Sequence, residues 1–408
     1  MDERRTTICC SALALILFCS RTVCAQSHVA GPLALFPTTP VWTLPLNSQL
    51  VAAPAYDSTH AYFAIEGDRL LCYRLATGAR EWIATARPLW EPVAGDNLLF
   101  VAEAQTLTAF RVADGTVAWQ LPFADKLAVR PVWDNGWLVV ATADSAILAF
   151  RASDGFLVWR RDLAAPAHAA PALAADRLYV PVAHGEVVAL RIDTGAPVWQ
   201  RRLGGPPNDL LALDDRVYVG SMDNFFYCLD AKDGRIEWRW RTGADVVGLP
   251  IVADDRVYFV SLDNVLRALS RGNGTLRWFR PLPLRPSAGP LLVGNTIVIA
   301  GIAPKLQGYD VKDGTPAGDL ATNGELAAPP HRVDGSVVPR VVIVTRDIAK
   351  GATAQFVARA VEPDIQTIGP LPTPVVPPAR LPGSVPADGP TDPVPAVNPT
   401  SAVPAQNP

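Results

Sequence analysis

Side chains able to ligate a metal ion are sparse in this chain. Its 408 residues include five histidines and six cysteines. A structural zinc site draws on cysteines or histidines spaced a few residues apart. The histidines show no such spacing, so we interpret each as a loop or turn residue: His28, His60, His168, His184 and His331.

Acidic residues recur immediately before a glycine, at Asp114, Asp154, Asp233 and Asp313. Convergent carboxylates could bind Ca²⁺, but an aspartate at a turn usually accepts hydrogen bonds from the turn's own backbone. The same interpretation holds for two Ser-x-Asp-Asn segments, at 221–224 and 261–264. The sequence also has no nucleophile elbow, phosphate-binding loop or dinucleotide-binding glycine motif. We therefore predict no catalytic residue, metal ligand or cofactor-binding residue.

Residues 1–25 are typical of a signal peptide. Arg4 and Arg5 precede an apolar stretch at 8–18 that is too short to span a bilayer. Small residues then lead to Gln26, the expected mature start. A lipidated cysteine is the alternative, but neither Cys19 nor Cys24 follows a small residue. We expect an exported, periplasmic protein, with an association with the outer membrane left open, and no transmembrane span.

Signal-peptide removal would leave Cys72 and Cys228 as the only cysteines. Two cysteines in an oxidising compartment favour a disulfide. Their places in the repeat described next put them on opposite sides of a ring, which argues against a bond. We interpret both as small core residues.

A glycine followed four residues later by tryptophan recurs about every forty residues. The glycines are Gly78, Gly115, Gly155, Gly195, Gly234, Gly274 and Gly314. The tryptophans are Trp82, Trp119, Trp159, Trp199, Trp238 and Trp278, with Gly318 at the seventh place. Trp42 lies forty residues before Trp82. A period near forty with strand-like content is the signature of propeller blades.

Each repeat holds short β-branched and aromatic runs separated by polar turns, as in Arg177–Val180 and Val187–Leu190. Alternating side chains of a strand point to opposite sides of a sheet, and in the third run both sides are apolar. Both faces of each sheet are therefore buried, as in stacked blades. The position six residues before each glycine accepts only small side chains, Cys72 and Cys228 among them.

Three-strand units begin near eight positions between 51 and 327, and the eighth has no fourth strand of its own. The segment that contains Trp42 can supply it and so close the ring without an unpaired edge. We predict an all-β protein, an eight-bladed β-propeller of four-stranded antiparallel blades. Residues 26–40 would form an N-terminal segment, 41–362 the propeller and 363–408 a proline-rich disordered tail.

The formal net charge is −3 and no basic tract is present. Nucleic-acid binding needs clustered Lys and Arg side chains that neutralise phosphates. The charge pattern therefore argues against a nucleic-acid partner.

The Asp-Gly-x-x-x-Trp repeat with its Arg-Val-Tyr-Val strands resembles the pyrroloquinoline-quinone-type propeller repeat over residues 42–362. Within that class, the stretch from Leu203 to Val219 looks like a blade of the BamB branch, periplasmic scaffolds of the outer-membrane β-barrel assembly machine. The resemblance implies a monomer without cofactor that binds protein partners in the cell envelope. Register and resemblance together place partner contacts in three loops, at Lys126, Leu127, Arg130, His168, Asn208 and Asp209.

Our leading hypothesis is a non-catalytic protein-binding scaffold. The first alternative is a pyrroloquinoline-quinone-dependent dehydrogenase, which would need Ca²⁺ ligands and covering loops that the short blade connections do not provide. The second is a cell-wall or polysaccharide-binding propeller, for which the proline-rich tail is the only hint.

Overall fold

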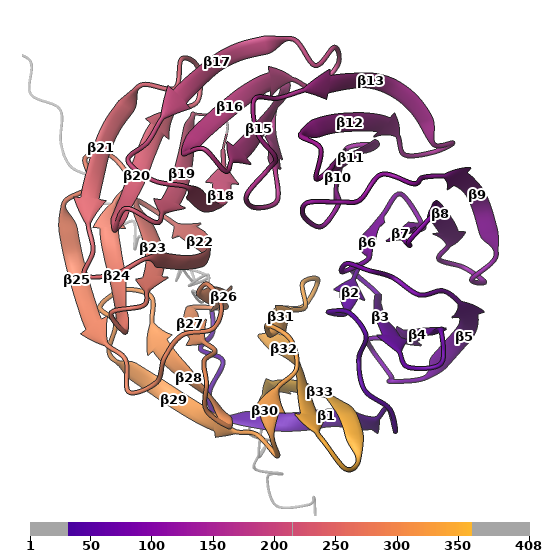
Figure 1. Ribbon diagram of the computed structural model, residues 1–408. Helices are drawn as coiled ribbons and strands as arrows, with labels where there is room; N and C mark the ends of the chain where they lie inside the picture. The colour runs from indigo at the N-terminus through magenta and orange to yellow at the C-terminus, as the bar shows by residue number, and fades with distance from the viewer. Residues whose placement is uncertain (1–31, 214, 361–408) are drawn as a thin grey trace, which may run out of the picture. The chain divides into compact units, whose positions relative to one another are not determined.

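The computed structural model describes residues 32–213 and 215–360, and the predicted signal peptide and proline-rich tail lie outside them. The described residues fold into eight antiparallel sheets, the blades, arranged around a central axis (Figure 1). The predicted eight-bladed propeller is confirmed. Among these residues no helix is long and apolar enough to cross a membrane.

Blades 1 to 4 each contain four strands that are consecutive in the chain. Blade 1 contains β2 (Ala55–Tyr56), β3 (His60–Ile65), β4 (Arg69–Arg74) and β5 (Arg80–Thr85). Blade 2 contains β6 (Val93–Gly95), β7 (Leu98–Ala102), β8 (Thr106–Arg111) and β9 (Val117–Pro122). Blade 3 contains β10 (Val132–Asp134), β11 (Trp137–Ala141), β12 (Ala146–Arg151) and β13 (Phe156–Asp162). Blade 4 contains β14 (Ala172–Ala174), β15 (Arg177–Val182), β16 (Glu186–Arg191) and β17 (Pro197–Arg202).

Blades 5 to 7 follow the same order, whereas blade 8 does not. Blade 5 contains β18 (Pro207–Ala212), β19 (Arg216–Ser221), β20 (Phe225–Asp230) and β21 (Ile236–Arg241). Blade 6 contains β22 (Val246–Ala253), β23 (Arg256–Ser261), β24 (Val265–Ser270) and β25 (Leu276–Pro281). Blade 7 contains β26 (Leu291–Val293), β27 (Thr296–Ile299), β28 (Lys305–Asp310) and β29 (Pro316–Ala321). Blade 8 contains β30 (Glu325–Leu326), β31 (His331–Arg332), β32 (Arg340–Asp347), β33 (Gly351–Arg359) and β1 (Thr38–Pro45).

The N-terminal strand closes the ring, as predicted. Strand β1 pairs antiparallel with β33, the last described strand, and Trp42 lies opposite Phe356. In Figure 1 the indigo β1 lies beside the yellow β33 at the rim of blade 8. The two ends of the described chain thus meet in one sheet, in which β1 takes the place of the outer, fourth strand.

Tryptophans of the outer strands lock neighbouring blades together. The indole of Trp42 packs on Gly78 of blade 1, and its Nε1 donates a hydrogen bond to the Leu75 carbonyl at 2.8 Å. The same contact with the next blade recurs around the ring for Trp82, Trp119, Trp159, Trp199 and Trp238. Trp278 packs on Gly314 in this way, but its Nε1 has no hydrogen-bond partner among the described residues. Each turn glycine has a positive φ, +69° at Gly78, which a left-handed turn requires.

The core lies between the blades, because the middle strands are buried on both faces. In β4, for example, the four residues from Leu70 to Tyr73 are all buried, and β12 and β20 show the same pattern. Cys72 and Cys228 are free and buried, in blades 1 and 5. They occupy equivalent places in β4 and β20, opposite Trp82 and Trp238.

Blade 7 replaces its tryptophan in an unforeseen way. Gly318 stands at the tryptophan position, and a side chain there would lie 2.7 Å from the Cβ and Cγ of Phe36. Phe36 and the neighbouring Leu35 are buried between blades 7 and 8. The backbone of this N-terminal segment is fixed by Arg359, which donates hydrogen bonds to the carbonyls of Ala34 and Phe36.

Candidate partner-binding site at the mouth of the channel

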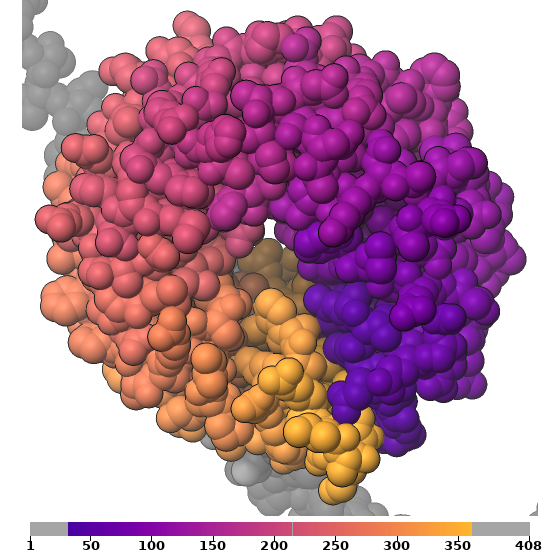
Figure 2. Space-filling view, in the orientation of Figure 1, coloured from indigo at the N-terminus to yellow at the C-terminus, as the bar shows by residue number. Residues whose placement is uncertain are grey.

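The ring encloses a channel that is hollowed at its centre (Figure 2). A cavity of about 680 Å³ at one mouth is lined by the segments that enter blades 1 to 6. A second cavity, of about 630 Å³, continues into the channel and shares six lining residues with the first. The shared residues are Glu91, Arg130, Ala170, Asp209, Val247 and Gly248.

Four of the six residues predicted to contact a partner meet at this mouth. Arg130, His168, Asn208 and Asp209 line the same cavity, although they come from three different blades. They converge because each lies in or just before the innermost strand of its blade, and inner strands face the axis. Asn208 also donates a hydrogen bond to the Val246 carbonyl at 2.8 Å, which ties β18 to β22.

The other two predicted residues lie elsewhere. Leu127 is only 7% exposed and packs in the core between blades 2 and 3. Its backbone forms a bridge with Thr142, which turns the side chain inward. Lys126 is exposed but is not among the residues that line the cavity.

Charged groups of both signs surround the mouth. The guanidinium of Arg130 lies 3.9 Å from the Glu91 carboxylate. Burial raises the pKa of Glu91, against the opposing effect of Arg130. Burial likewise raises the pKa of Asp209, although Arg130 and His168 both act to lower it. Two carboxylates are thus held where desolvation disfavours their charged forms, and a partner that brings hydrogen-bond donors would relieve that cost.

Exposed apolar side chains lie next to these charges and were not predicted. Leu89 is 58% exposed and Met222 is 47% exposed, and both line the cavity together with Trp90 and Leu262. Met222 and Leu262 follow the second strands of blades 5 and 6, in the two Ser-x-Asp-Asn turns. The repeat could have predicted that Met222 and Leu262 lie near each other, because equivalent positions of successive repeats lie on one face of the ring.

The turn aspartates have the structural role predicted for them. Asp114 accepts a hydrogen bond from the Thr116 amide at 2.9 Å, and Asp154, Asp233 and Asp313 do the same in their own turns. Asp223 accepts from the Phe225 amide of its own turn and from Tyr227. Asp263 differs from the prediction, because it accepts from the Gly243 amide of another segment and pairs with Arg267.

The acids at the mouth do not converge into a cation site of the kind that a quinone cofactor with Ca²⁺ needs. Among the described residues, one group of three His, Cys, Asp or Glu side chains has its ligand atoms within 4.8 Å of one another. That group is His60, Cys72 and Glu81 in blade 1, away from the channel-mouth cavity.

Two histidines lie in strands and not in the predicted loops or turns. His60 is the first residue of β3, and His331 lies in β31.

The architecture and repeat define the chain as a β-propeller of the pyrroloquinoline-quinone-like repeat class. The family model described as outer membrane protein assembly factor BamB matches residues 34–130, 103–213 and 183–361. The chain belongs to this family.

Solved structures show the same fold at low sequence identity. BamB from Moraxella catarrhalis is 19% identical with a TM-score of 0.63, over 78% of this chain and 99% of that one. The computationally designed Ika8 protein is 14% identical with a TM-score of 0.63, over 76% of this chain and 96% of that one. Quinohemoprotein alcohol dehydrogenase from Comamonas testosteroni is 12% identical with a TM-score of 0.60, over 80% of this chain and 77% of that one. No curated protein matches the sequence.

Proposed function

We propose that this protein is a non-catalytic periplasmic scaffold that binds a segment of a partner protein across the mouth of its channel. The partner would belong to the machinery that assembles outer-membrane β-barrels. Membership in the BamB family supports the partner class. The observation that carries the proposal is the mouth itself, where Arg130, Asn208 and Asp209 lie beside exposed Leu89 and Met222.

The surface chemistry fits a polypeptide. Protein interfaces combine an apolar centre, in which Met and aromatic residues are enriched, with polar groups that fix register. Leu89, Trp90, Met222 and Leu262 supply the apolar part, and the surrounding charges supply the polar part. A rigid ring with a preformed site also avoids the ordering cost that a flexible loop would add on binding.

The test is affinity capture from a native envelope extract with the purified protein as bait. We expect components of the β-barrel assembly machine to be retained. Leu89→Asp and Met222→Asp should each weaken capture about tenfold, because both side chains are exposed and removing them leaves the core intact. Ile348→Ser, at the fully exposed turn between β32 and β33, is the matched control and should bind normally. Recovery of no assembly component by the unaltered protein would reject this partner.

A quinone-dependent dehydrogenase is the second candidate, favoured by the fold that this chain shares with the Comamonas enzyme. Titration with pyrroloquinoline quinone and Ca²⁺ distinguishes the two. Saturable binding accompanied by reduction of an electron-accepting dye would replace the scaffold proposal. We expect neither.

A further inference from the structure

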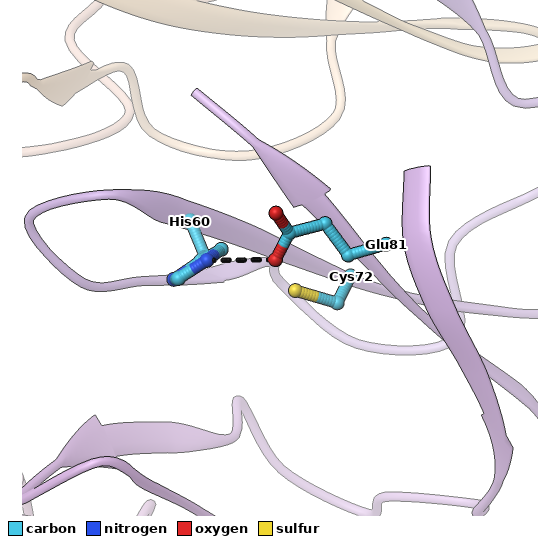
Figure 3. A group of neighbouring side chains, drawn as sticks. All are labelled: His60, Cys72 and Glu81. Carbon is cyan, nitrogen blue, oxygen red and sulfur yellow. Dashed lines mark ion pairs between the residues drawn. The ribbon is translucent and has the colours of Figure 1, made fainter. Parts of the chain in front are cut away.

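Three side chains with metal-binding chemistry meet in blade 1. His60 begins β3, Cys72 lies in β4 and Glu81 lies in β5, and their ligand atoms are within 4.8 Å of one another (Figure 3). Cys72 is fully buried, and the side chains of His60 and Glu81 are 13% and 20% exposed. Three neighbouring strands of one rigid sheet therefore fix a nitrogen, a sulfur and an oxygen around one point.

Both ring nitrogens of His60 lie against carboxylates. Nδ1 lies 3.1 Å from the Asp57 carboxylate, and Nε2 lies 2.9 Å from Glu81 Oε2. Carboxylates only accept hydrogen bonds, and a neutral imidazole has one N–H. When Nδ1–H donates to Asp57, the Nε2 lone pair faces the Glu81 oxygen. Either a second ring proton or a metal ion removes that conflict, and the ion requires Nε2 and Oε2 to separate by a few tenths of an ångström.

Asp57 is built to orient the imidazole. Its carboxylate accepts hydrogen bonds from the amides of Thr59 and His60, both at 2.7 Å, and from Tyr62 at 2.5 Å. A carboxylate that receives the far N–H of a histidine is the usual support of a metal-bound imidazole, because it fixes the tautomer and the ring direction. Arg74 similarly pairs with the second oxygen of Glu81 and leaves Oε2 turned to His60.

Blade 5 contains the same arrangement with an arginine in place of the histidine. Arg216, Cys228 and Glu237 occupy the places of His60, Cys72 and Glu81 relative to the turn glycine. The Arg216 guanidinium lies 3.1 Å from Glu237 and is itself the cation beside the carboxylate. In blade 1 the arginine of this arrangement is replaced by histidine, a side chain that can ligate a metal.

We propose that His60 Nε2, Cys72 Sγ and Glu81 Oε2 bind a divalent transition metal ion of the zinc type. Imidazole, thiolate and carboxylate are the ligands that zinc takes in proteins, and four-coordination leaves one place for water. A recess of about 240 Å³ lies beside His60 and is lined also by Asp57 and Asn97, although Cys72 and Glu81 do not line it. On binding, Cys72 releases its thiol proton to solvent, since the thiolate is the ligand.

The position of this site gives it a structural consequence. Blade 1 is the blade against which the closing strand packs, because Trp42 of β1 lies on Gly78 and donates a hydrogen bond to the Leu75 carbonyl. An ion that joins β3, β4 and β5 would stiffen the blade on which the ring closes. Binding that occurs only in the folded state raises stability, so the metal should raise the unfolding temperature.

The experiment uses the purified full chain, stripped with a chelator and titrated with Co²⁺ and then Zn²⁺. We expect one equivalent of Co²⁺ to produce a thiolate-to-cobalt charge-transfer band in the near ultraviolet, and Zn²⁺ to displace it. Cys72→Ala should abolish the band and weaken Zn²⁺ binding about a hundredfold. Alanine occupies this place in blades 2, 3, 4 and 6, so the variant should fold.

Two further variants make the test specific. His60→Arg recreates the arrangement of blade 5 and should lose binding, whereas Cys228→Ala should keep the band, the affinity and the zinc-dependent rise in unfolding temperature. Absence of a thiolate band in the unaltered chain, or unchanged affinity in Cys72→Ala, would overturn the proposal. The imidazole would then donate from Nε2 to Glu81 and accept at Nδ1 from the Thr59 hydroxyl, 2.8 Å away. Partner capture does not enter this experiment, so its outcome is independent of the proposed function.

Discussion

Phe36 lies over Gly318 in the space that a tryptophan fills in other blades. Each tryptophan packs on the turn between the third and fourth strands of the next blade. Blade 8 has no such turn, because its third and fourth strands, β33 and β1, come from opposite ends of the described chain. The segment that leads into β1 takes the vacant space, and Gly318, with a φ of +135°, leaves room for it.

Phe36→Ala should lower the free energy of unfolding by about 3–5 kcal/mol, as for other buried phenylalanines. Chemical denaturation followed by tryptophan fluorescence measures this. Phe156→Ala is the control, because that ring is exposed on β13 and its loss should change stability by about 0.5 kcal/mol or less. Equal effects of the two substitutions would contradict the packing role of Phe36.

Trp199→Ala should lower stability by about 3–5 kcal/mol, because the indole fills the boundary between blades 4 and 5. Trp199→Phe keeps much of the packing and loses the hydrogen bond to Ala231, which is 2.9 Å long. Trp199→Phe should therefore destabilise the protein less than Trp199→Ala does. Loss of the hydrogen bond should contribute about 1 kcal/mol, in addition to the effect of the smaller ring, because Arg177 still donates to the same carbonyl. A thermal unfolding midpoint of Trp199→Ala equal to that of the unaltered protein would reject this role for the repeated tryptophans.

His331 should make stability fall as the solution is acidified. Burial lowers its pKa to about 4, and its ring stacks on Tyr56 at 4.0 Å. An unfolded histidine titrates near pH 6.5, so between about pH 6.5 and 4 the unfolded state takes up a proton that the folded state does not. The stabilisation is present above pH 6.5 and is lost as pH falls through 4, on the order of 3 kcal/mol in all.

His331→Phe retains a flat ring for Tyr56 and removes the titration. The difference in stability between this variant and the unaltered protein, measured by denaturation at intervals from pH 7.5 to 4, should therefore change across that window. A difference that is constant with pH would contradict neutral burial of His331.

Asp209 and Asp263 should respond to pH in opposite directions. The pKa of Asp209 is raised by burial, so its favourable contribution is present below the unfolded value near 3.9 and is lost as pH rises through the folded value. Asp209→Asn should therefore be more stable than the unaltered protein at pH 7 and equal to it near pH 3. A lower stability at pH 7 would show that desolvation does not dominate at Asp209.

Asp263→Asn should be destabilising at pH 7, by about 1 kcal/mol. Burial acts to raise the pKa of Asp263, but hydrogen bonds from Arg267, Ser261 and the Gly243 amide hold it at about 2. That stabilisation is present above pH 4 and is lost as pH falls through 2. Thermal unfolding of both variants at pH 3 and 7 provides the comparison.

The sequence was sufficient to predict the blades, their number and the closing strand. Turn glycines and tryptophans are local features that repeat in fixed register, so each copy supports the others. The missing tryptophan at Gly318 was visible, but its replacement was not. Phe36 is far from Gly318 in sequence, and no period links the two.

The candidate site was predictable only where it followed the register. Arg130, His168 and Asn208 reach the mouth because the inner strand of every blade faces the axis. Leu127 does not, because its backbone bridge to Thr142 sets the direction of its side chain. His60 and Glu81 were missed because strand pairing, not sequence spacing, joins them, although comparison with Arg216 and Glu237 in the repeat could have related them.

Closure by β1 also sets the order in which the molecule can be completed. A ribosome makes β1 first and β33 last, so the pairing of Thr38 with Arg359 must wait until nearly all of the propeller exists. Until then the edge of β1 that pairs with β33 in the finished blade has no partner and is open to the wrong one. The edge of β1 therefore stays open to mispairing for almost the whole time that the ring takes to form.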